Sequence, residues 1–235
     1  MHLRDQPNDG TLNDIRGLHI HAEHVLAALQ DANDGPVAEG SVGAGAGTVC
    51  FGFKGGIGSS SRLVSSRGAS PPRYTVGALV QTNYGGILEL AGIPAGKELQ
   101  REQIQRYLNG DGSCMIIIAT DAPLAHAALM RLAKRAMLAI GRTGSSSSNG
   151  SGDYVIAFST SEKVRVPHVQ TRPTQRFEAV NNDVLSLLFQ AAMEATEEAI
   201  CNSLLRATAV TSADGLTIDA LPLGPLRTLI QRHRP

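Results

Sequence analysis

The sequence predicts a mixed α/β (α+β) protein in which sheets are covered by helices in layers. Three short apolar runs have the composition of strands, and two longer segments repeat apolar residues at helical spacing. These segments are Tyr74–Asn83, Ser113–Ala119, Tyr154–Thr160, Ala122–Ile140 and Asn181–Thr208. Glycine-rich turns separate them, and 42% of the 235 residues are hydrophobic. We therefore expect one layered domain, residues 1–235, with a sizeable core.

The first third of the chain predicts one helix and two strands. His21–Asn33 places apolar residues at helical spacing, and Gly35-Pro36 follows as a stop signal. In Glu39–Val64, glycine-rich loops flank a short β-type run, Thr48–Phe53. Tyr74–Asn83 is the strongest strand of this part because it is rich in β-branched and apolar residues.

The middle of the chain predicts a loop followed by a strand and a helix. Gly85–Asp111 is loop-like, with one helical turn expected near Gln103–Leu108. Ser113–Ala119 is a continuous apolar run and reads as a buried strand. Asp121 is expected to cap the helix Ala122–Ile140, which ends before Gly141.

The last third predicts a linker, a strand and two helices. Gly144–Asp153 has the composition of a flexible linker but leads directly into the strand Tyr154–Thr160. Asn181–Thr208 is a long helix with apolar residues along one side, interrupted by Thr196. The tail, residues 220–231, is expected to form a short final helix.

The composition excludes several classes of protein. The 21 basic and 21 acidic residues leave no net charge, which argues against nucleic acid or an anionic membrane as the main partner. Cys50, Cys114 and Cys201 are odd in number and widely spaced, so they indicate neither a disulfide framework nor a CxxC metal site. The N-terminus has no apolar core typical of a signal peptide. We expect a cytoplasmic protein.

The Gly112-Ser113 pair carries the chemistry that the residues suggest. A serine hydroxyl is a weak nucleophile until a base takes its proton, and the α-amine of a newly exposed N-terminal serine is such a base. Its reference pKa is about 7.7 to 8.0, so a useful fraction is neutral at physiological pH. A Gly-Ser bond that leads into a buried strand suits a self-cleaving amidohydrolase, although a plain turn before a strand has the same pattern.

Six segments carry a resemblance when they are taken together in chain order. They are TLNDIRG (Thr11–Gly17), GPVAEGSVGAGAGT (Gly35–Thr48), FKGGIGSSSR (Phe53–Arg62), LVQTNYG (Leu79–Gly85), GDGSCMIIIATDAPL (Gly110–Leu124) and GSGDYVIAFST (Gly150–Thr160). Together they resemble the self-processing serine aminopeptidases, a family that includes the L-aminopeptidase D-amidase/esterases and the β-peptidyl aminopeptidases. The match begins near Asp9 and extends to the tail IDALPLGPLRTLI.

The resemblance implies a fold and an activity. Members cleave themselves before the nucleophilic serine, here into residues 1–112 (α subunit) and 113–235 (β subunit). Their fold is a four-layer αββα sandwich resembling the N-terminal-nucleophile hydrolases, with different connectivity. They release N-terminal residues from peptides, amides or esters through an acyl-enzyme, with varied tolerance for D- and β-amino acids. They need no metal or organic cofactor and assemble as homo-oligomers of processed pairs.

The resemblance also implies roles for named residues. Ser113 matches the nucleophile, and Asn83 matches an asparagine whose amide donates to the oxyanion. Ser151 and Asp153 match the hydroxyl and carboxylate of the proton relay, and residues two apart at a strand start point to one face. Without the resemblance, Asn83 and Asp153 read as turn residues.

Two departures from the family pattern leave alternatives open. Thr11 stands where a tyrosine that assists the oxyanion is usual. The substantial N-terminal segment of the family is missing. Asp9 is then the nearby carboxylate for the substrate amine. The chain is therefore a fragment, a misassigned start or a shortened paralogue. One alternative function is a catalytically weak or inactive member with a structural role. Another is acyl transfer of the ornithine acetyltransferase type, which Ser113 disfavours because those enzymes use threonine.

Other polar motifs have simpler interpretations. VGAGAGT and KGGIGSSS do not fit the known phosphate-binding patterns, so tight turns or backbone approach to a peptide substrate explain them better. Lys54 is read as a structural or rim cation. The histidines, His19, His21, His24 and His126, are read as solvated rather than as metal ligands.

Overall fold

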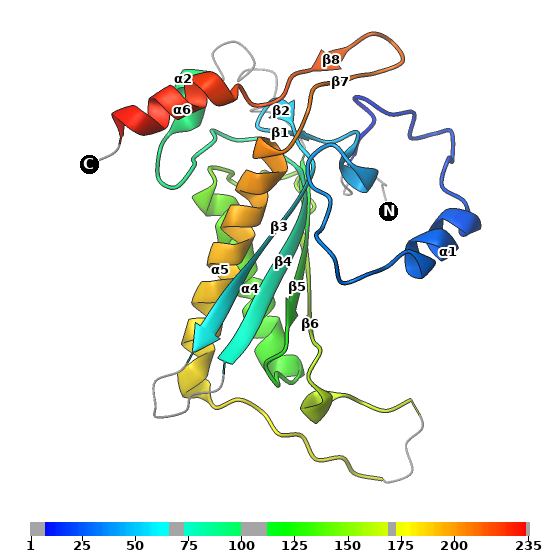
Figure 1. The fold of residues 1–235 in the computed structure, drawn as a ribbon, viewed down its shortest axis with the longest axis vertical. Helices are drawn as coiled ribbons and strands as arrows, with labels where there is room; N and C mark the ends of the chain where they lie inside the picture. Colours follow the sequence, from blue (N-terminus) through cyan, green and yellow to red (C-terminus); the bar gives the residue numbers. More distant parts are fainter. Residues whose placement is uncertain (1–7, 66–72, 100–111, 169–172, 234–235) are drawn as a thin grey trace.

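The computed structural model describes residues 8–65, 73–99, 112–168 and 173–233. At its centre lies a four-stranded sheet in the order β3-β4-β5-β6 (Figure 1). The strands are β3 (Ile57–Ser65), β4 (Arg73–Asn83), β5 (Ser113–Thr120) and β6 (Tyr154–Ser159). The first three are antiparallel, whereas β6 is parallel to β5 because the chain returns through a helix between them.

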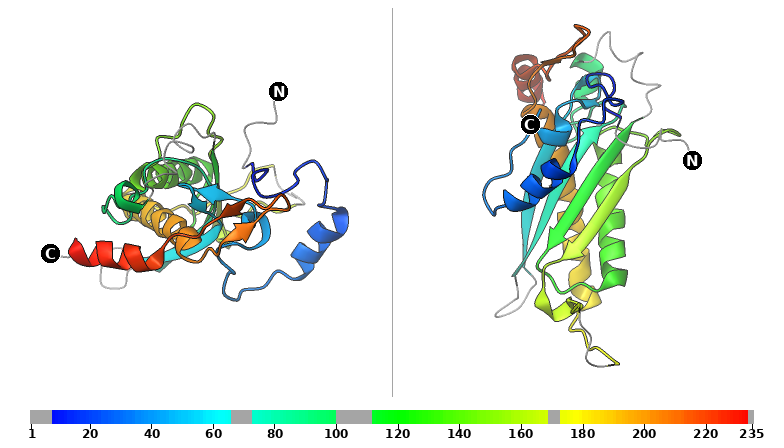
Figure 2. Two further views of the ribbon diagram at one scale, coloured as in Figure 1. Left: turned by 90° about the horizontal axis from the view of Figure 1, so that it is seen from above. Right: turned by 90° about the vertical axis from the view of Figure 1, so that its right-hand side faces the viewer.

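Two long helices cover one face of this sheet. Both α4 (His126–Arg142) and α5 (Asn182–Leu205) lie on the same side, with α1 (Ala22–Gln30) on the other (Figure 2, left panel). Alternate residues of β5 point toward the helices, so Ile116 and Ile118 are fully buried. Apolar residues of α4 and α5, such as Ile140 and Leu188, complete this core.

Helix α5 lies unusually close to the edge strand β3. A Cβ atom on Gly58 would stand 1.9 Å from the carbonyl oxygen of Ala199, so only glycine allows this approach. Asn202 Nδ2 donates to the carbonyl of Ser59 at 2.9 Å, and the hydroxyls of Thr82 and Ser203 are 2.8 Å apart. These contacts fix α5 along β3 and β4.

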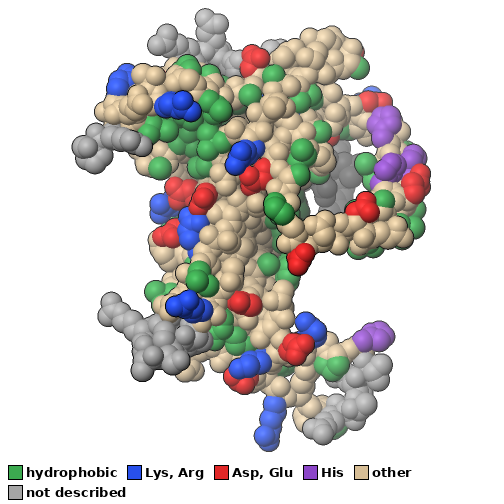
Figure 3. Space-filling view, in the orientation of Figure 1, with side chains coloured by type: hydrophobic (Ala, Val, Ile, Leu, Met, Phe, Trp, Pro, Cys, Tyr) green, Lys and Arg blue, Asp and Glu red, His purple; other side chains and the backbone are tan. Residues whose placement is uncertain are grey.

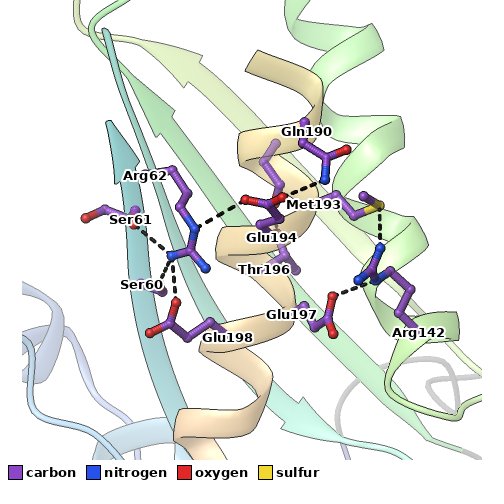
Figure 4. Close-up of polar contacts among 11 residues, drawn as sticks. Ser60, Ser61, Arg62, Arg142, Gln190, Met193, Glu194, Thr196, Glu197 and Glu198 are labelled. Atoms are coloured by element: carbon purple, nitrogen blue, oxygen red, sulfur yellow. Dashed lines mark hydrogen bonds and ion pairs between the residues drawn. The ribbon is translucent and has the colours of Figure 1, made fainter. Parts of the chain in front are cut away.

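Ion pairs reinforce the same contact at the surface. Arg62 of β3 lies between Glu194 and Glu198 of α5, while Arg142 of α4 pairs with Glu197 (Figure 4). The Arg62 guanidinium lowers the pKa of the Glu198 carboxyl through a hydrogen bond. Because these side chains are partly exposed, the ion pairs add little stability.

The opposite face of the sheet is apolar and exposed. Tyr154, Ile156 and Phe158 of β6 are 47%, 56% and 43% exposed, and Leu63 of β3 is 66% exposed. Strands that are apolar on both faces are typical of sheets covered on both sides. The described residues supply one large sheet and one helix layer, which confirms the mixed α/β class; the second sheet of the expected four-layer sandwich is not formed by these residues.

The N-terminal part forms an arm that stands away from this body (Figures 1 and 3). Its helix, α1 (Ala22–Gln30), buries none of its residues. Val25, Leu26 and Leu29 are more than half exposed on it. The arm then returns to the body, where Glu39 Oε1 accepts from the N–H of Ser59 at 2.7 Å.

Smaller elements complete the described chain. They are η1 (Gly43–Gly45), β1 (Val49–Cys50), β2 (Phe53–Lys54), α2 (Ala95–Leu99), η2 (Glu162–Val164), β7 (Val210–Thr211), β8 (Thr217–Ile218) and α6 (Leu223–Arg232). None of the helices in the described ranges combines the length and the apolarity needed to cross a bilayer.

Several elements occur where the sequence predicts them. These are the helices α1, α5 and α6 and the strands β4, β5 and β6. The prediction for Glu39–Val64 is wrong in part, because β3 occupies Ile57–Ser65 and pairs with β4 along its whole length. The expected run Thr48–Phe53 is instead a hairpin of β1 and β2, because Phe51 and Gly52 adopt positive φ angles of 54° and 79°.

Helix α4 begins later than the sequence predicts. Its first residue is His126, not Ala122, because Pro123 disfavours helical backbone at Ala122. Asp121 does not cap it; its carboxylate accepts from the N–H of Thr75 at 2.7 Å. The loop predicted for Gly85–Asp111 contains the short helix α2, and the helical turn expected at Gln103–Leu108 lies outside the described residues.

Candidate functional site

Ser113 and Asn83 are neighbours at one end of the sheet. Ser113 is the first residue of β5 and Asn83 the last of β4, and the antiparallel register pairs them directly. Ser113 is 2% and Asn83 is 7% exposed. The hydroxyl predicted to be the nucleophile therefore lies in a buried setting beside the predicted oxyanion donor.

The side-chain amide of Asn83 is held from both ends. Its Oδ1 accepts from the N–H of Val49 in β1 at 2.9 Å, and its Nδ2 donates to the carbonyl of Asn8 at 3.2 Å. The first bond directs the NH₂ group away from β1 and toward the N-terminal segment. Asn83 and Ser113 line the same cavity, which is described below.

Ser151 and Asp153 form a hydroxyl–carboxylate pair next to the same serine. Ser151 Oγ donates to Asp153 Oδ2 at 2.9 Å, and Asp153 Oδ1 accepts from the N–H of Cys114 at 2.9 Å. Since Cys114 follows Ser113 directly, the carboxylate is fixed one residue from the candidate nucleophile. The loop before β6 thus brings both predicted relay residues to the start of β5.

Between them, the backbone N–H of Gly152 contacts the Gly112-Ser113 unit itself. It donates to the carbonyl oxygen of Gly112 at 3.0 Å and to Ser113 Oγ at 3.2 Å. Gly112 is tightly enclosed, since a Cβ atom there would stand 2.5 Å from the Cα of Tyr84. The peptide bond before Ser113 is therefore held by a buried backbone donor.

A cavity of about 640 Å³ opens onto this arrangement. Its lining residues are Asn8, Gly10, Thr11, Asn13, Asp14, Ile15, Arg16, Asn83, Gly112 and Ser113. Thr11, predicted to contact substrate, is therefore part of the wall. Asp9, predicted for the same role, is not among these lining residues; its carboxylate accepts from Asn13 Nδ2 at 2.6 Å.

Lys54 is a buried cation that binds two backbone carbonyls. Its side chain is fully buried, and Nζ donates to the carbonyls of Gly45 at 2.6 Å and Gly55 at 2.8 Å. Burial lowers the pKa of this amine to about 8. Thr48 contacts the same two glycines: its Oγ1 donates to the carbonyl of Gly45, and its own carbonyl accepts from the N–H of Gly55. Lys54 is thus a structural cation.

The nearby thiols are poor nucleophiles. Burial raises the pKa of Cys50 to about 12 and also raises the pKa of Cys114, which directly follows Ser113. Both thiols are therefore protonated at neutral pH. In the parts of the chain that the structure describes, no three His, Cys, Asp or Glu side chains are grouped so as to hold a metal ion.

The contacts that the sequence did not predict are mostly backbone groups. The N–H groups of Gly152 and Val49 and the carbonyl of Asn8 have no side-chain signature. Asn13 and Arg16 of the cavity wall are a different case, because they belong to the TLNDIRG segment that the family resemblance already marked.

Comparison with known proteins identifies relatives that match nearly the whole chain. The model of peptidase family S58 matches residues 5–218. The chain is 46% identical over 247 residues to the beta-peptidyl aminopeptidase BapA of Sphingosinicella microcystinivorans, a match that covers 96% of this chain and 60% of that protein. The chain thus spans about 60% of the length of the curated relatives it matches.

Solved structures give the same result. The L-aminopeptidase D-Ala-esterase/amidase of Ochrobactrum anthropi, described as a prototype for the serine aminopeptidases with a new variant of the Ntn hydrolase fold, matches with a TM-score of 0.86 and 37% identity over 96% of this chain and 61% of its own. A beta-aminopeptidase of Burkholderia sp. matches with a TM-score of 0.83 and 40% identity, over 97% of this chain and 64% of its own. The predicted family and the mixed α/β class are confirmed, and the matched structures have a variant of the Ntn hydrolase fold.

Proposed function

Because the chain belongs to peptidase family S58, we propose that it is a self-processing serine aminopeptidase whose nucleophile is Ser113. The observation that carries this proposal is the setting of the Gly112-Ser113 peptide bond. Its carbonyl and the serine hydroxyl share one buried N–H donor, and Asn83 stands beside them in the sheet register.

Self-cleavage begins with attack of Ser113 Oγ on the carbonyl carbon of Gly112. The hydroxyl proton passes to the Ser151–Asp153 pair, whose carboxylate is anchored by the N–H of Cys114. The C–N bond between Gly112 and Ser113 then breaks, and the nitrogen takes up the proton. Water hydrolyses the resulting ester, which leaves residues 1–112 and 113–235 with a free amine on Ser113.

Turnover of substrate uses the same hydroxyl with a new base. The freed α-amine of Ser113 accepts the proton of Oγ as the oxygen attacks the carbonyl of the substrate's N-terminal residue. Asn83 Nδ2 donates to the oxyanion, and Thr11 contributes to the wall that receives the substrate. Water then releases the acyl group. The substrates are short peptides, amino-acid amides or esters, in line with the names of the relatives.

Further properties of the proposed enzyme follow from its surface. The balanced charge, with 21 basic and 21 acidic residues, argues against a nucleic-acid or membrane partner. The three widely spaced cysteines favour a reducing, cytoplasmic compartment. The exposed apolar side of β6, with Ile156 and Phe158, favours association of processed pairs into homo-oligomers. Size-exclusion chromatography with light scattering tests this, and a monodisperse single pair contradicts it.

A hydrolysis assay tests the activity. The parent chain, Ser113→Ala and the control Ser186→Ala, which alters an exposed serine of α5, are incubated with para-nitroanilides of an L-, a D- and a β-amino acid. The parent and Ser186→Ala should release nitroaniline, and Ser113→Ala should not. Release by Ser113→Ala at the parent rate contradicts the assignment of the nucleophile.

A further inference from the structure

We propose that the backbone N–H of Gly152 is the oxyanion donor for self-cleavage at Gly112-Ser113. This inference rests on the proposed function. Its basis is one three-centre contact, in which the N–H of Gly152 lies 3.0 Å from the Gly112 carbonyl oxygen and 3.2 Å from Ser113 Oγ. These two acceptors are the electrophile's oxygen and the attacking nucleophile.

The shared contact favours the charge that develops during attack. As Oγ bonds to the carbonyl carbon of Gly112, the π electrons move onto the carbonyl oxygen, which becomes an oxyanion. The same N–H then donates to a negative oxygen instead of a neutral one, and a charge-assisted bond is about twice as strong. Gly152 and Ser113 are buried, and a preorganised donor is worth more in such a setting than in water.

The donor is fixed in place before the reaction. On one side of Gly152, the N–H of Ser151 donates to the carbonyl of Ser148 at 2.8 Å. On the other side, Asp153 is bound to the N–H of Cys114 and to Ser151 Oγ. Because both neighbours are anchored, the N–H of Gly152 does not have to reorient when the oxyanion forms.

Asn83 is engaged differently in the uncleaved chain. Its Nδ2 donates to the carbonyl of Asn8, and its Oδ1 accepts from Val49. The scissile carbonyl of Gly112 instead accepts from Gly152 at 3.0 Å. Self-cleavage and turnover therefore use different oxyanion donors. Gly152 donates to the carbonyl oxygen of the chain's own peptide bond, and Asn83 donates to that of the substrate that enters the cavity.

Replacing one backbone atom tests this donor. Cell-free translation with a suppressor tRNA carrying glycolic acid replaces the N–H of residue 152 with an ester oxygen and leaves every side chain unchanged. The same tRNA carrying glycine gives the parent chain, and glycolate at Gly150 controls for an ester in the same loop. Self-cleavage should slow by about 10² to 10³ with the ester at 152, while the ester at 150 should leave the rate close to that of the parent chain.

The outcomes separate the two proposals. If the glycine-loaded chain cleaves and the ester at 152 cleaves as fast, the Gly152 donor is refuted and self-processing stands. If the glycine-loaded chain itself stays intact, self-processing is refuted and the donor with it. A second measurement does not depend on the folding of the ester variant: in the folded Ser113→Ala chain, a through-hydrogen-bond NMR coupling between the Gly152 nitrogen and the Gly112 carbonyl carbon is expected, and its absence refutes the donor.

Discussion

Replacing Lys54 with methionine should change how the stability of the protein depends on pH. The buried Nζ of Lys54 donates to the carbonyls of Gly45 and Gly55 and is paired with no carboxylate in these contacts. Burial lowers its pKa from 10.5 to about 8. Methionine has a similar length and is apolar, so it fills the site but has no proton to lose in this range.

The size of the effect follows from these two values. Between pH 8 and pH 10.5 the unfolded chain holds a proton on Lys54 that the folded chain has released. Stability therefore rises with pH across this window, by about 3 kcal/mol in total for the difference between 10.5 and about 8. Below pH 8 the amine is charged in both states, and the full cost of burying the ammonium is present.

Urea unfolding measures this difference. The parent and Lys54→Met are compared in the Ser113→Ala background, which keeps the chain intact, with Lys97→Met as an exposed control. The free energy of unfolding of the parent minus that of Lys54→Met should rise by about 3 kcal/mol from about pH 7.5 to about pH 10.5. Cys50, whose thiol interacts electrostatically with Lys54, is replaced by alanine in both chains so that its titration does not enter the difference. A difference that stays flat or falls refutes the assignment of a buried, depressed lysine.

Three further substitutions test the packing and the site. Gly58→Ala puts a Cβ 1.9 Å from the Ala199 carbonyl and should lower the free energy of unfolding in urea by about 1 to 3 kcal/mol or more; unchanged stability contradicts the close approach of α5. Gly112→Ala brings a Cβ to 2.5 Å from Tyr84 Cα and should slow self-cleavage by about 10² through displacement of the carbonyl; parent-like cleavage on a denaturing gel rules this out. Asp153→Asn removes the carboxylate that accepts from Ser151 and should slow self-cleavage by roughly 10² to 10⁴; a normal rate excludes it from the relay.

The sequence predicts those elements in which apolar residues repeat with a regular period. Strand β5 and helix α5 were found because their apolar residues repeat at the periods of a buried strand and of an amphipathic helix. Strand β3 was missed because the serine-rich stretch from Ile57 to Ser65 has little β character of its own. Its structure comes from pairing with β4 and from the approach of α5 at Gly58, and both are long-range contacts.

Some residues of the site were also predictable from the sequence, and others were not. Ser113, Asn83, Ser151 and Asp153 were marked by motifs, and the structure brings them together at one end of the sheet; their chemical roles stay predictions. The N–H of Gly152 could not be found from the sequence, since every residue except proline carries such a group and only the fold aims it.

The mass of the intact purified protein under denaturing conditions is the most direct test. Self-processing at Ser113 predicts two species, residues 1–112 and residues 113–235, and a single uncut species from Ser113→Ala. One mass for the whole 235-residue chain in the parent preparation contradicts the central claim that this site performs its own first acyl transfer.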